Sequence, residues 1–281
     1  MDTWKADLHL HTSFSDGSDL SDDLLRKVKE KGIHYCAITD HDTLAGVEAV
    51  TKIPSGITLI NGIEFSTITK YREAHILGYG FDMSHPAMKK VIEKGRLKRK
   101  RKLENRLLYL DEHDYLFLEE DKQKLRQLNA CAKPHLARML MKYHYVENME
   151  EGIKIIAQCH DDDDRLPYQD VIQAIHDAHG WAIWAHPLGG EHKRHLAPWE
   201  CERQLQLLRE AGIDGLECYY SRYTQEEEAY LCDLSKRFDL LISGGSDYHG
   251  INKSVELGRL NSEGYTIEAK QLTVLQKLVK Q

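Results

Sequence analysis

Short apolar segments of strand length alternate with amphipathic helical segments along most of this chain of 281 residues. This alternation is typical of strand–helix units, which place helices outside a parallel sheet. Strands are predicted at residues 6–10, 35–39, 57–60, 63–67, 74–81, 181–185, 213–219 and 240–243. Helices are predicted from the N-cap Ser21 to Gly32 and at residues 43–52, 168–179, 198–211, 225–238 and 267–279. Roughly seven such units in one α/β domain favour a closed or distorted barrel over an open sheet.

The pattern changes between residues 84 and 158, where the sequence predicts helices and no convincing strand. We therefore expect an all-helical insertion at 84–158 in a barrel domain built from residues 1–83 and 159–281. The insertion carries a basic run at residues 96–102. Like charges four residues apart destabilise a helix, so a phosphate partner is one interpretation of this run. A solvent-exposed helix face is the interpretation that we favour.

Nearly every predicted strand delivers a histidine or a carboxylate near its end. These residues are His9, His11, Asp16, Asp40, His41, Asp42, Glu64, His75, His186, Glu217, Asp247 and His249. Because the carboxyl ends of barrel strands form one face, residues far apart in sequence converge there. Each residue alone has an ordinary interpretation, such as a turn at Asp16 or a hydrogen-bonded core histidine at His75. Without a shared site, a separate ordinary interpretation would have to be true for every one of these residues on the same face. A single shared site is therefore the favoured explanation.

The residue types on this face predict a metal site. Neutral imidazole and carboxylate suit Zn, Mn or Fe. His9 and His11 project from one side of a strand, because side chains alternate with period two, and Asp247 and His249 repeat that spacing. The 6 cysteines contain no C-x-x-C pair, which argues against a thiolate zinc site and suits a reducing cytosol.

Charge and hydropathy narrow the class of protein. The net charge of −7 argues against a nonspecific nucleic-acid binder, but it allows a local basic groove. The first residues lack the basic and apolar regions of a signal peptide, and no apolar run approaches the ~20 residues of a membrane span. We expect a cytoplasmic protein with no membrane association, and nothing in the sequence implies a stable protein partner.

Six segments occur in an order that resembles a known family. They are HLHTSFSDG, AITDHDT, GIEFS, HILGYGF, AHPLGG and GGSDYHG, and they span residues 9–250. Together they resemble the PHP (polymerase and histidinol phosphatase) family, in particular its stand-alone metal-dependent phosphoesterases. The resemblance implies a distorted (β/α)7 TIM-like barrel with two or three divalent metal ions.

The resemblance also implies a set of metal ligands. The first metal would be held by His9, His11, Glu64 and Asp247. Glu64 would bridge to a second metal, completed by His75 and His186, and Asp16, His41 and His249 would hold a third. Catalysis would depend on Asp16, His41, Glu64, Asp247 and His249. All nine ligands are present, so the sequence predicts an active enzyme.

Three residues are predicted to bind substrate. Lys133-Pro134-His135 resembles a family segment often written Arg-Pro-His, so His135 would face the substrate, while Lys133 departs from the pattern. Phosphate anchors are expected near the strand ends, where the loops offer Arg194, within a segment at 192–195, and Arg222. For both arginines, a solvated loop charge is the alternative. Asp40 is predicted to orient an imidazole, and Glu217 either to do so or to face the substrate.

The predicted function is hydrolysis of phosphate esters of nucleotides, through a water that bridges the metals. The motifs most resemble the branch that acts on 3′,5′-nucleotide bisphosphates or short RNA from its 5′ end. A phosphatase for histidinol phosphate or another small phosphomonoester is one alternative. A non-catalytic metal-binding regulatory module is a second, and the complete ligand set argues against it.

Overall fold

The protein is described by a computed structural model that covers residues 4–159, 165–190 and 194–279. The helices are α1 (Ser21–Glu30), α2 (Ala45–Glu48), α3 (Pro86–Glu112), α4 (Glu119–Gln127), α5 (Lys133–Lys142), α6 (Met149–Ala157), α7 (Tyr168–Asp177), α8 (Pro198–Glu210), α9 (Gln225–Arg237) and α10 (Leu275–Leu278). The strands are β1 (Lys5–Leu10), β2 (Ile33–Ile38), β3 (Thr58–Ile68), β4 (Glu73–Tyr79), β5 (Leu166–Pro167), β6 (Trp181–Trp184), β7 (Gly215–Tyr220) and β8 (Leu241–Gly245). None of these helices is both long and apolar enough to cross a membrane.

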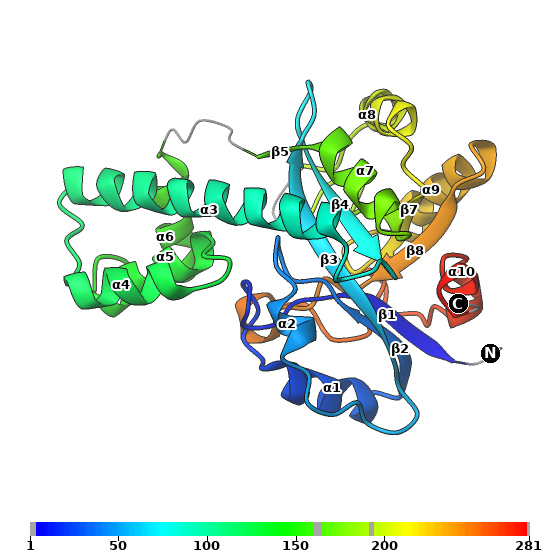
Figure 1. The fold of residues 1–281 in the computed structure, drawn as a ribbon, viewed down its shortest axis with the longest axis horizontal. Helices are drawn as coiled ribbons and strands as arrows, with labels where there is room; N and C mark the ends of the chain where they lie inside the picture. The colour runs from blue at the N-terminus through cyan, green and yellow to red at the C-terminus, as the bar shows by residue number, and fades with distance from the viewer. Residues whose placement is uncertain (1–3, 160–164, 191–193, 280–281) are drawn as a thin grey trace.

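The strands form one sheet that curls into a barrel (Figure 1). Its order is β1-β2-β3-β4-β6-β7-β8, with the short β5 beside β3. The two ends of the sheet meet where the end of β1 lies beside the residues that follow β8. There the amide of Asp247 donates to the carbonyl of His9 at 2.9 Å, and the amide of His11 donates to the carbonyl of Tyr248 at 3.0 Å. The predicted distorted α/β barrel is therefore confirmed.

The expectation of a wholly parallel sheet is wrong at β4. This strand pairs antiparallel with both β3 and β6, whereas the remaining neighbours along the sheet are parallel. Only four residues, 69–72, connect β3 to β4, and so short a connection allows only an antiparallel hairpin.

Two predicted strands are one. Residues 57–60 and 63–67 belong to the single strand β3, and Asn61-Gly62 is not a turn. A Cβ on Gly62 would lie 2.8 Å from Cγ2 of Thr39 and 2.9 Å from the carbonyl oxygen of Ile38. Gly62 therefore allows β3 to approach the end of β2 closely. A glycine inside a strand often marks such a close approach of two backbones.

Two predicted helices are much shorter than expected. The helix at 43–52 is reduced to α2, because Asp22 accepts hydrogen bonds from the amide and hydroxyl of Thr51 and directs the chain away. The helix at 267–279 is interrupted where Thr273 and Val274 pair with Ile242 of β8. Ser21 is not the N-cap of α1: it is the first helical residue, and its hydroxyl donates to the carbonyl of Gly46.

The helices from α3 to α6 lie in succession between β4 and β5. The first part of α3 packs against the barrel through Met88 and Val91. Its second part packs with α4, α5 and α6 around a separate apolar cluster that includes Leu107, Leu136 and Leu140. Figure 1 shows α4, α5 and α6 gathered at the end of α3 that lies away from the barrel.

Candidate metal centre

The structure brings all nine predicted ligand side chains together at one end of the barrel. The strands and the loops that follow them supply these residues because β1, β2, β6 and β8 end on this face, while β3 and β4 pass across it. The nine side chains are buried or at most about one-fifth exposed, and they are His9, His11, Asp16, His41, Glu64, His75, His186, Asp247 and His249.

Glu64 occupies the middle of this group. Five imidazole nitrogens lie within 3.3 Å of its two carboxylate oxygens. Oε2 faces Nε2 of His9, Nε2 of His11 and Nδ1 of His41, at 3.3, 3.3 and 3.0 Å. Oε1 faces Nδ1 of His75 and Nε2 of His186, at 2.8 and 3.1 Å. One carboxylate therefore presents its two oxygens to two different sets of histidines.

Asp16 and Asp247 complete the group on either side. Asp16 lies 3.1 Å from Nε2 of His249 and 3.7 Å from Nε2 of His41. Asp247 lies 3.3 Å from Nε2 of His11 through Oδ1, and its Oδ2 receives hydrogen bonds from Tyr220 and Lys253. Tyr220 and Lys253 were not predicted from the sequence, because neither follows the pattern of histidines and acids at strand ends.

Ligand atoms in this group approach one another closely enough to share a metal ion. Three sets have donor atoms within 4.8 Å of one another: His9, His11 and Glu64; His41, Glu64 and His75; and His11, Asp16, His41 and His249. These sets differ in part from the implied assignment, because His11 and His41 each occur in two of them and His186 and Asp247 in none. The clusters of histidine and carboxylate could bind metal, as expected.

Several buried atoms in these clusters make no hydrogen bond with any described residue, although carboxylate or imidazole atoms lie close to them. They are Nε2 of His9, His11 and His249, Nδ1 of His41 and Oε2 of Glu64. A buried polar atom without a partner destabilises a fold by several kcal/mol in an apolar medium, on the order of 2–7. Because the five atoms point toward a common centre and belong to residue types that ligate Zn, Mn and Fe, the residues fit divalent metal ions.

The surrounding protein fixes the orientation of the histidine rings. Nδ1 of His9 lies 2.9 Å from Oε1 of Glu217, and the other oxygen of Glu217 accepts the amide of His186 at 2.7 Å. Of the two predicted roles for Glu217, this contact supports orientation of an imidazole. Nδ1 of His249 lies 2.8 Å from the carbonyl oxygen of Asp247. A proton on each Nδ1 leaves Nε2 free to face the centre.

Asp40 contacts no imidazole among the described residues, so the prediction that it orients one directly is wrong. Its carboxylate accepts the amide and hydroxyl of Thr12, at 2.8 and 2.5 Å, and the hydroxyl of Ser15 at 2.5 Å. Asp40 therefore holds the loop that carries Asp16. The sequence could not distinguish these roles, because both require a buried carboxylate at the end of β2.

Burial and charge act in opposite directions on the central carboxylates. Burial alone raises the pKa of Glu64, but the imidazoles of His41, His75 and His9 outweigh it and hold the pKa well below its usual range. Burial likewise raises the pKa of Asp247, and Lys253, His249 and His9 hold it well below its usual range. Both carboxylates are therefore ionised at neutral pH, as ligation requires.

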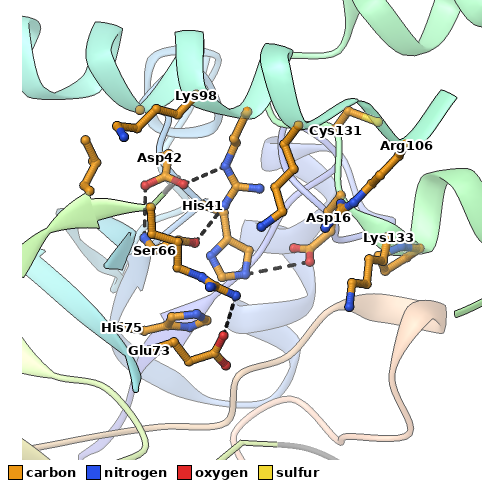
Figure 2. Close-up of a pocket in the computed structure, with 17 residues that line it drawn as sticks. Asp16, His41, Asp42, Ser66, Glu73, His75, Lys98, Arg106, Cys131 and Lys133 are labelled. Carbon is orange, nitrogen blue, oxygen red and sulfur yellow. Dashed lines mark hydrogen bonds and ion pairs between the residues drawn. The ribbon is translucent and has the colours of Figure 1, made fainter. Parts of the chain in front are cut away.

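A cationic pocket of about 290 Å³ adjoins the histidines (Figure 2). Figure 2 shows Lys98, Arg106 and Lys133 around the same hollow as His41, His75 and Asp16. The basic residues that line it are Lys98, Arg99, Lys102, Arg106, Lys133 and Arg165, against the acids Asp16, Asp42 and Glu73. A second cavity of about 680 Å³ is lined by Glu64, His186, Lys253 and neighbouring residues.

The interpretation of residues 96–102 as a solvent-exposed face is wrong for Arg99. Its guanidinium lies 2.6 Å from Asp42 and 2.9 Å from the hydroxyl of Ser66, and the side chain is only 17% exposed. Lys100 and Arg101, in contrast, are exposed. A run of seven residues covers almost two helical turns, so its members face different directions and cannot share one interpretation.

The three predicted substrate-binding residues lie in different places. His135 lies in the first turn of α5, next to the pocket residues Lys133 and Pro134, and its Nδ1 accepts the amide of Ala132 at 3.1 Å. Arg194 is largely exposed and pairs with Glu200 at 2.8 Å, while Arg222 lies 3.4 Å from Ser254, a residue of the second cavity. Neither arginine is among the described residues that line the two cavities. Residues 192 and 193 of the predicted anchoring segment lie outside the described residues.

Comparison with known families identifies the chain. The model of the PHP domain matches residues 7–166, more than half of the sequence. The chain belongs to the PHP domain family. The resemblance based on the six motifs is thereby confirmed. The chain is a hydrolytic phosphoesterase of the metal-dependent PHP type.

Relatives of the PHP chain share nearly its whole length. A 5′-3′ exoribonuclease of Haemophilus influenzae is 32% identical over 92% of this chain and 94% of its own length. A phosphoribosyl 1,2-cyclic phosphate 1,2-diphosphodiesterase of Eggerthella lenta is 29% identical over 94% and 99%. A solved structure from Bifidobacterium adolescentis, provisionally described as a metal-dependent phosphoesterase, is 25% identical with a TM-score of 0.80 over 99% of this chain and 96% of that one.

Proposed function

We propose that this PHP enzyme hydrolyses phosphate esters of nucleotides, either 3′,5′-nucleotide bisphosphates or short oligoribonucleotides. The observation that carries the proposal is the position of the cationic pocket, which shares Asp16, His41 and His75 with the candidate metal centre. A substrate with two phosphate groups fits such a site, since one group can lie at the metal ligands while basic side chains bind the other. The similarity to the exoribonuclease of H. influenzae supports this substrate class.

Two or three ions of Mn, Zn or Fe type would be held by the nine clustered ligands. Glu64 would be the shared ligand, because its two oxygens face separate groups of histidines. Bound there, such ions lower the pKa of a coordinated water and neutralise charge on the phosphoryl oxygens. The roles of Asp16, His41, Asp247 and His249 as catalytic ligands are part of the same proposal.

The chain itself would orient the substrate through the cationic pocket. Asp42 and Ser66 hold the guanidinium of Arg99 in place, so it can form a paired hydrogen bond with a phosphate at little cost in side-chain entropy. Lys133, at the start of α5, would add a positive charge without that paired geometry. His135 would approach the same phosphate, whereas Arg194 and Arg222 would act only at the outer edge of the site.

We further propose that residues 84–158 form a cap over the metal centre, inserted in a barrel domain of residues 1–83 and 159–281. Support comes from the cationic pocket, to which α3 contributes four basic residues and α5 contributes Lys133. The separate apolar cluster of α3 to α6 would let the cap keep its own shape. A cap with these charges would select substrates by size and number of phosphates. A cytoplasmic location would suit the six cysteines, none of which forms a disulfide.

A panel of phosphoesters tests this function. The metal-loaded protein is given adenosine 3′,5′-bisphosphate, a 5′-phosphorylated pentaribonucleotide, phosphoribosyl 1,2-cyclic phosphate and histidinol phosphate at equal concentration. We expect kcat/KM for one of the two nucleotides to exceed that for histidinol phosphate by at least a hundredfold. A preference for histidinol phosphate would favour the small-molecule phosphatase, and no turnover of any ester would favour a regulatory metal-binding module.

A further inference from the structure

An exposed aromatic and basic surface lies beside the metal centre, outside the site described above. Tyr71, in the connection between β3 and β4, and Trp199, at the start of α8, are 41% and 63% exposed. The guanidinium carbon of Arg203 lies 4.0 Å from the centroid of the Tyr71 ring and 5.2 Å from that of Trp199. We call these three residues the aromatic platform. In Figure 1 the β3–β4 connection rises beside α8 at the top of the molecule.

Hydrogen bonds hold the segments beneath the platform together, although its rings are exposed. Gln204, which is buried, accepts a hydrogen bond from the hydroxyl of Thr69 at 2.9 Å and donates to the carbonyl of Glu73 at 3.5 Å. Thr69 also closes the hairpin, because its amide donates to the carbonyl of Arg72 at 2.9 Å. Gln204 therefore joins α8 to both ends of the connection and fixes the spacing of the two backbone segments that carry the platform.

Two adjacent hollows lie between the platform and the metal centre. The nearer one is lined by His75, His186, Arg72 and Glu73, and so it begins at two of the candidate ligands. The farther one is lined by Tyr71, Arg72, Glu73 and Arg203, and it measures about 350 Å³, within the roughly 300–1,000 Å³ of ligand sites. Arg72 and Glu73 line both hollows, so the two hollows are adjacent, and the nearer one, of about 20 Å³, is too small for a nucleotide.

The charges around these hollows are suited to a phosphate backbone. Lys70, Arg72 and Arg203 contribute positive charge, and the ammonium of Lys70 lies 5.0 Å from the Tyr71 ring. The two acids that line the farther hollow are paired with arginines outside its lining, Glu73 with Arg165 and Glu200 with Arg194. Exposed aromatic rings beside a basic groove are the arrangement by which proteins hold single-stranded nucleic acid without sequence preference.

We infer that Tyr71, Trp199 and Arg203 stack the bases of a single-stranded oligonucleotide whose terminal phosphate lies at the metal centre. This inference rests on the proposed function and specifies its substrate: an oligonucleotide reaches the platform, and a mononucleotide bisphosphate does not. Stacking tolerates any base, because every base has an aromatic face. Arg203 itself offers a planar surface that can stack on a base once the strand binds.

Kinetics with two substrates test the platform. In the metal-loaded protein, we expect Trp199→Ala and Arg203→Ala each to raise KM for a 5′-phosphorylated pentaribonucleotide about 5- to 50-fold, since stacking contributes substantially per base. KM and kcat for adenosine 3′,5′-bisphosphate should change less than twofold. Trp4→Ala is the matched control, because Trp4 is also an exposed aromatic residue, 42% exposed and stacked on His34. Trp4 directly precedes β1 and therefore lies at the opposite end of that strand from the metal centre.

The outcomes separate this inference from the proposed function. Unchanged KM for the pentaribonucleotide in both variants overturns the platform, and so does an equal rise for both substrates. If the wild-type protein hydrolyses no nucleotide, the proposed function fails, and binding of a 3′-fluorescein-labelled pentaribonucleotide is measured by anisotropy instead. Weaker binding by Trp199→Ala and Arg203→Ala, but not by Trp4→Ala, then still supports the platform, and equal binding by all three overturns it.

Discussion

Glu217 Oε1 lies 2.9 Å from His9 Nδ1, and both side chains are fully buried. The second oxygen of Glu217 accepts the amide of His186 at 2.7 Å. One carboxylate therefore positions residues from two different strands, β1 and the end of β6, around the candidate metal centre. It also determines which nitrogen of His9 carries the proton.

Replacing Glu217 with Gln should weaken metal binding. The side-chain amide can accept only one of the two hydrogen bonds, and its NH2 group would face the other donor, so His9 would shift its proton to Nε2. Loss of such an orienting partner typically lowers metal affinity 10- to 100-fold. Competition with a chelator measures this affinity, and Glu210→Gln, at an exposed position on α8, is the control. Equal affinity in both variants would contradict the role of Glu217.

Arg99 should contribute more to substrate binding than its exposed neighbours. Arg99→Lys keeps the charge but loses the paired hydrogen-bonding geometry, so we expect KM for a nucleotide bisphosphate to rise about tenfold with a smaller change in kcat. Arg101→Lys should leave both constants unchanged, because Arg101 is exposed on the same helix. Similar kinetics for the two variants would show that Arg99 only packs against Asp42.

Gly245 should not tolerate a side chain. A Cβ there would lie 2.2 Å from Cβ of His9 and 2.5 Å from its amide nitrogen. Gly245→Ala should therefore displace β1 from β8 and lower the free energy of unfolding by about 1–3 kcal/mol, with loss of bound metal. At Gly190 a Cβ meets no atom closer than 3.7 Å, so Gly190→Ala serves as the control in urea unfolding. A wild-type midpoint for Gly245→Ala would count against this close approach.

Stability should fall as the pH rises through the titration of Glu228. This residue is 3% exposed, and burial raises its pKa from 4.5 to about 7 despite a hydrogen bond from Tyr265. The folded state therefore binds more protons than the unfolded state between pH 4.5 and 7, and the stabilisation present at low pH is lost as the pH rises through 7.

Glu228→Gln should remove this loss. Relative to the variant, the wild-type free energy of unfolding should decline by an amount on the order of 1–3 kcal/mol between pH 5 and pH 8. Urea unfolding at the two pH values measures the difference, and Glu226→Gln, at an exposed position of the same helix, should behave as the wild type. Parallel pH profiles for the wild type and Glu228→Gln would exclude the effect.

The barrel could be predicted from the sequence because its signal is local and repeated. Nearly every predicted strand has a histidine or a carboxylate near its end, and the spacing of His9 and His11 alone places two imidazoles on one side of a strand. The errors in the fold arise where a distant partner decides. In the sequence Gly62 resembles a turn residue, because its close contact with Thr39 of another segment is not visible there. The segment at Thr273 likewise has a helical pattern, and only its pairing with Ile242 interrupts the helix.

The surroundings of the site were harder to predict for the same reason. Asp40, Lys253 and Arg99 all depend on contacts across the fold, with Thr12, Asp247 and Asp42 respectively. No local pattern distinguishes Arg99 from Arg101, since only the phase of a long helix directs one side chain toward the barrel and the other toward solvent. The grouping of the ligands around Glu64 likewise depends on strand pairing rather than on sequence spacing.

The metal content of the wild type and of Glu64→Ala tests the central claim most directly. Elemental analysis of protein purified without chelators should find two or three ions of Mn, Zn or Fe type per wild-type chain. Because both oxygens of Glu64 face histidines, the variant should retain at most one ion while keeping the circular dichroism spectrum of the folded barrel. One ion or none in the wild type, or the same content in a folded Glu64→Ala variant, would contradict the account.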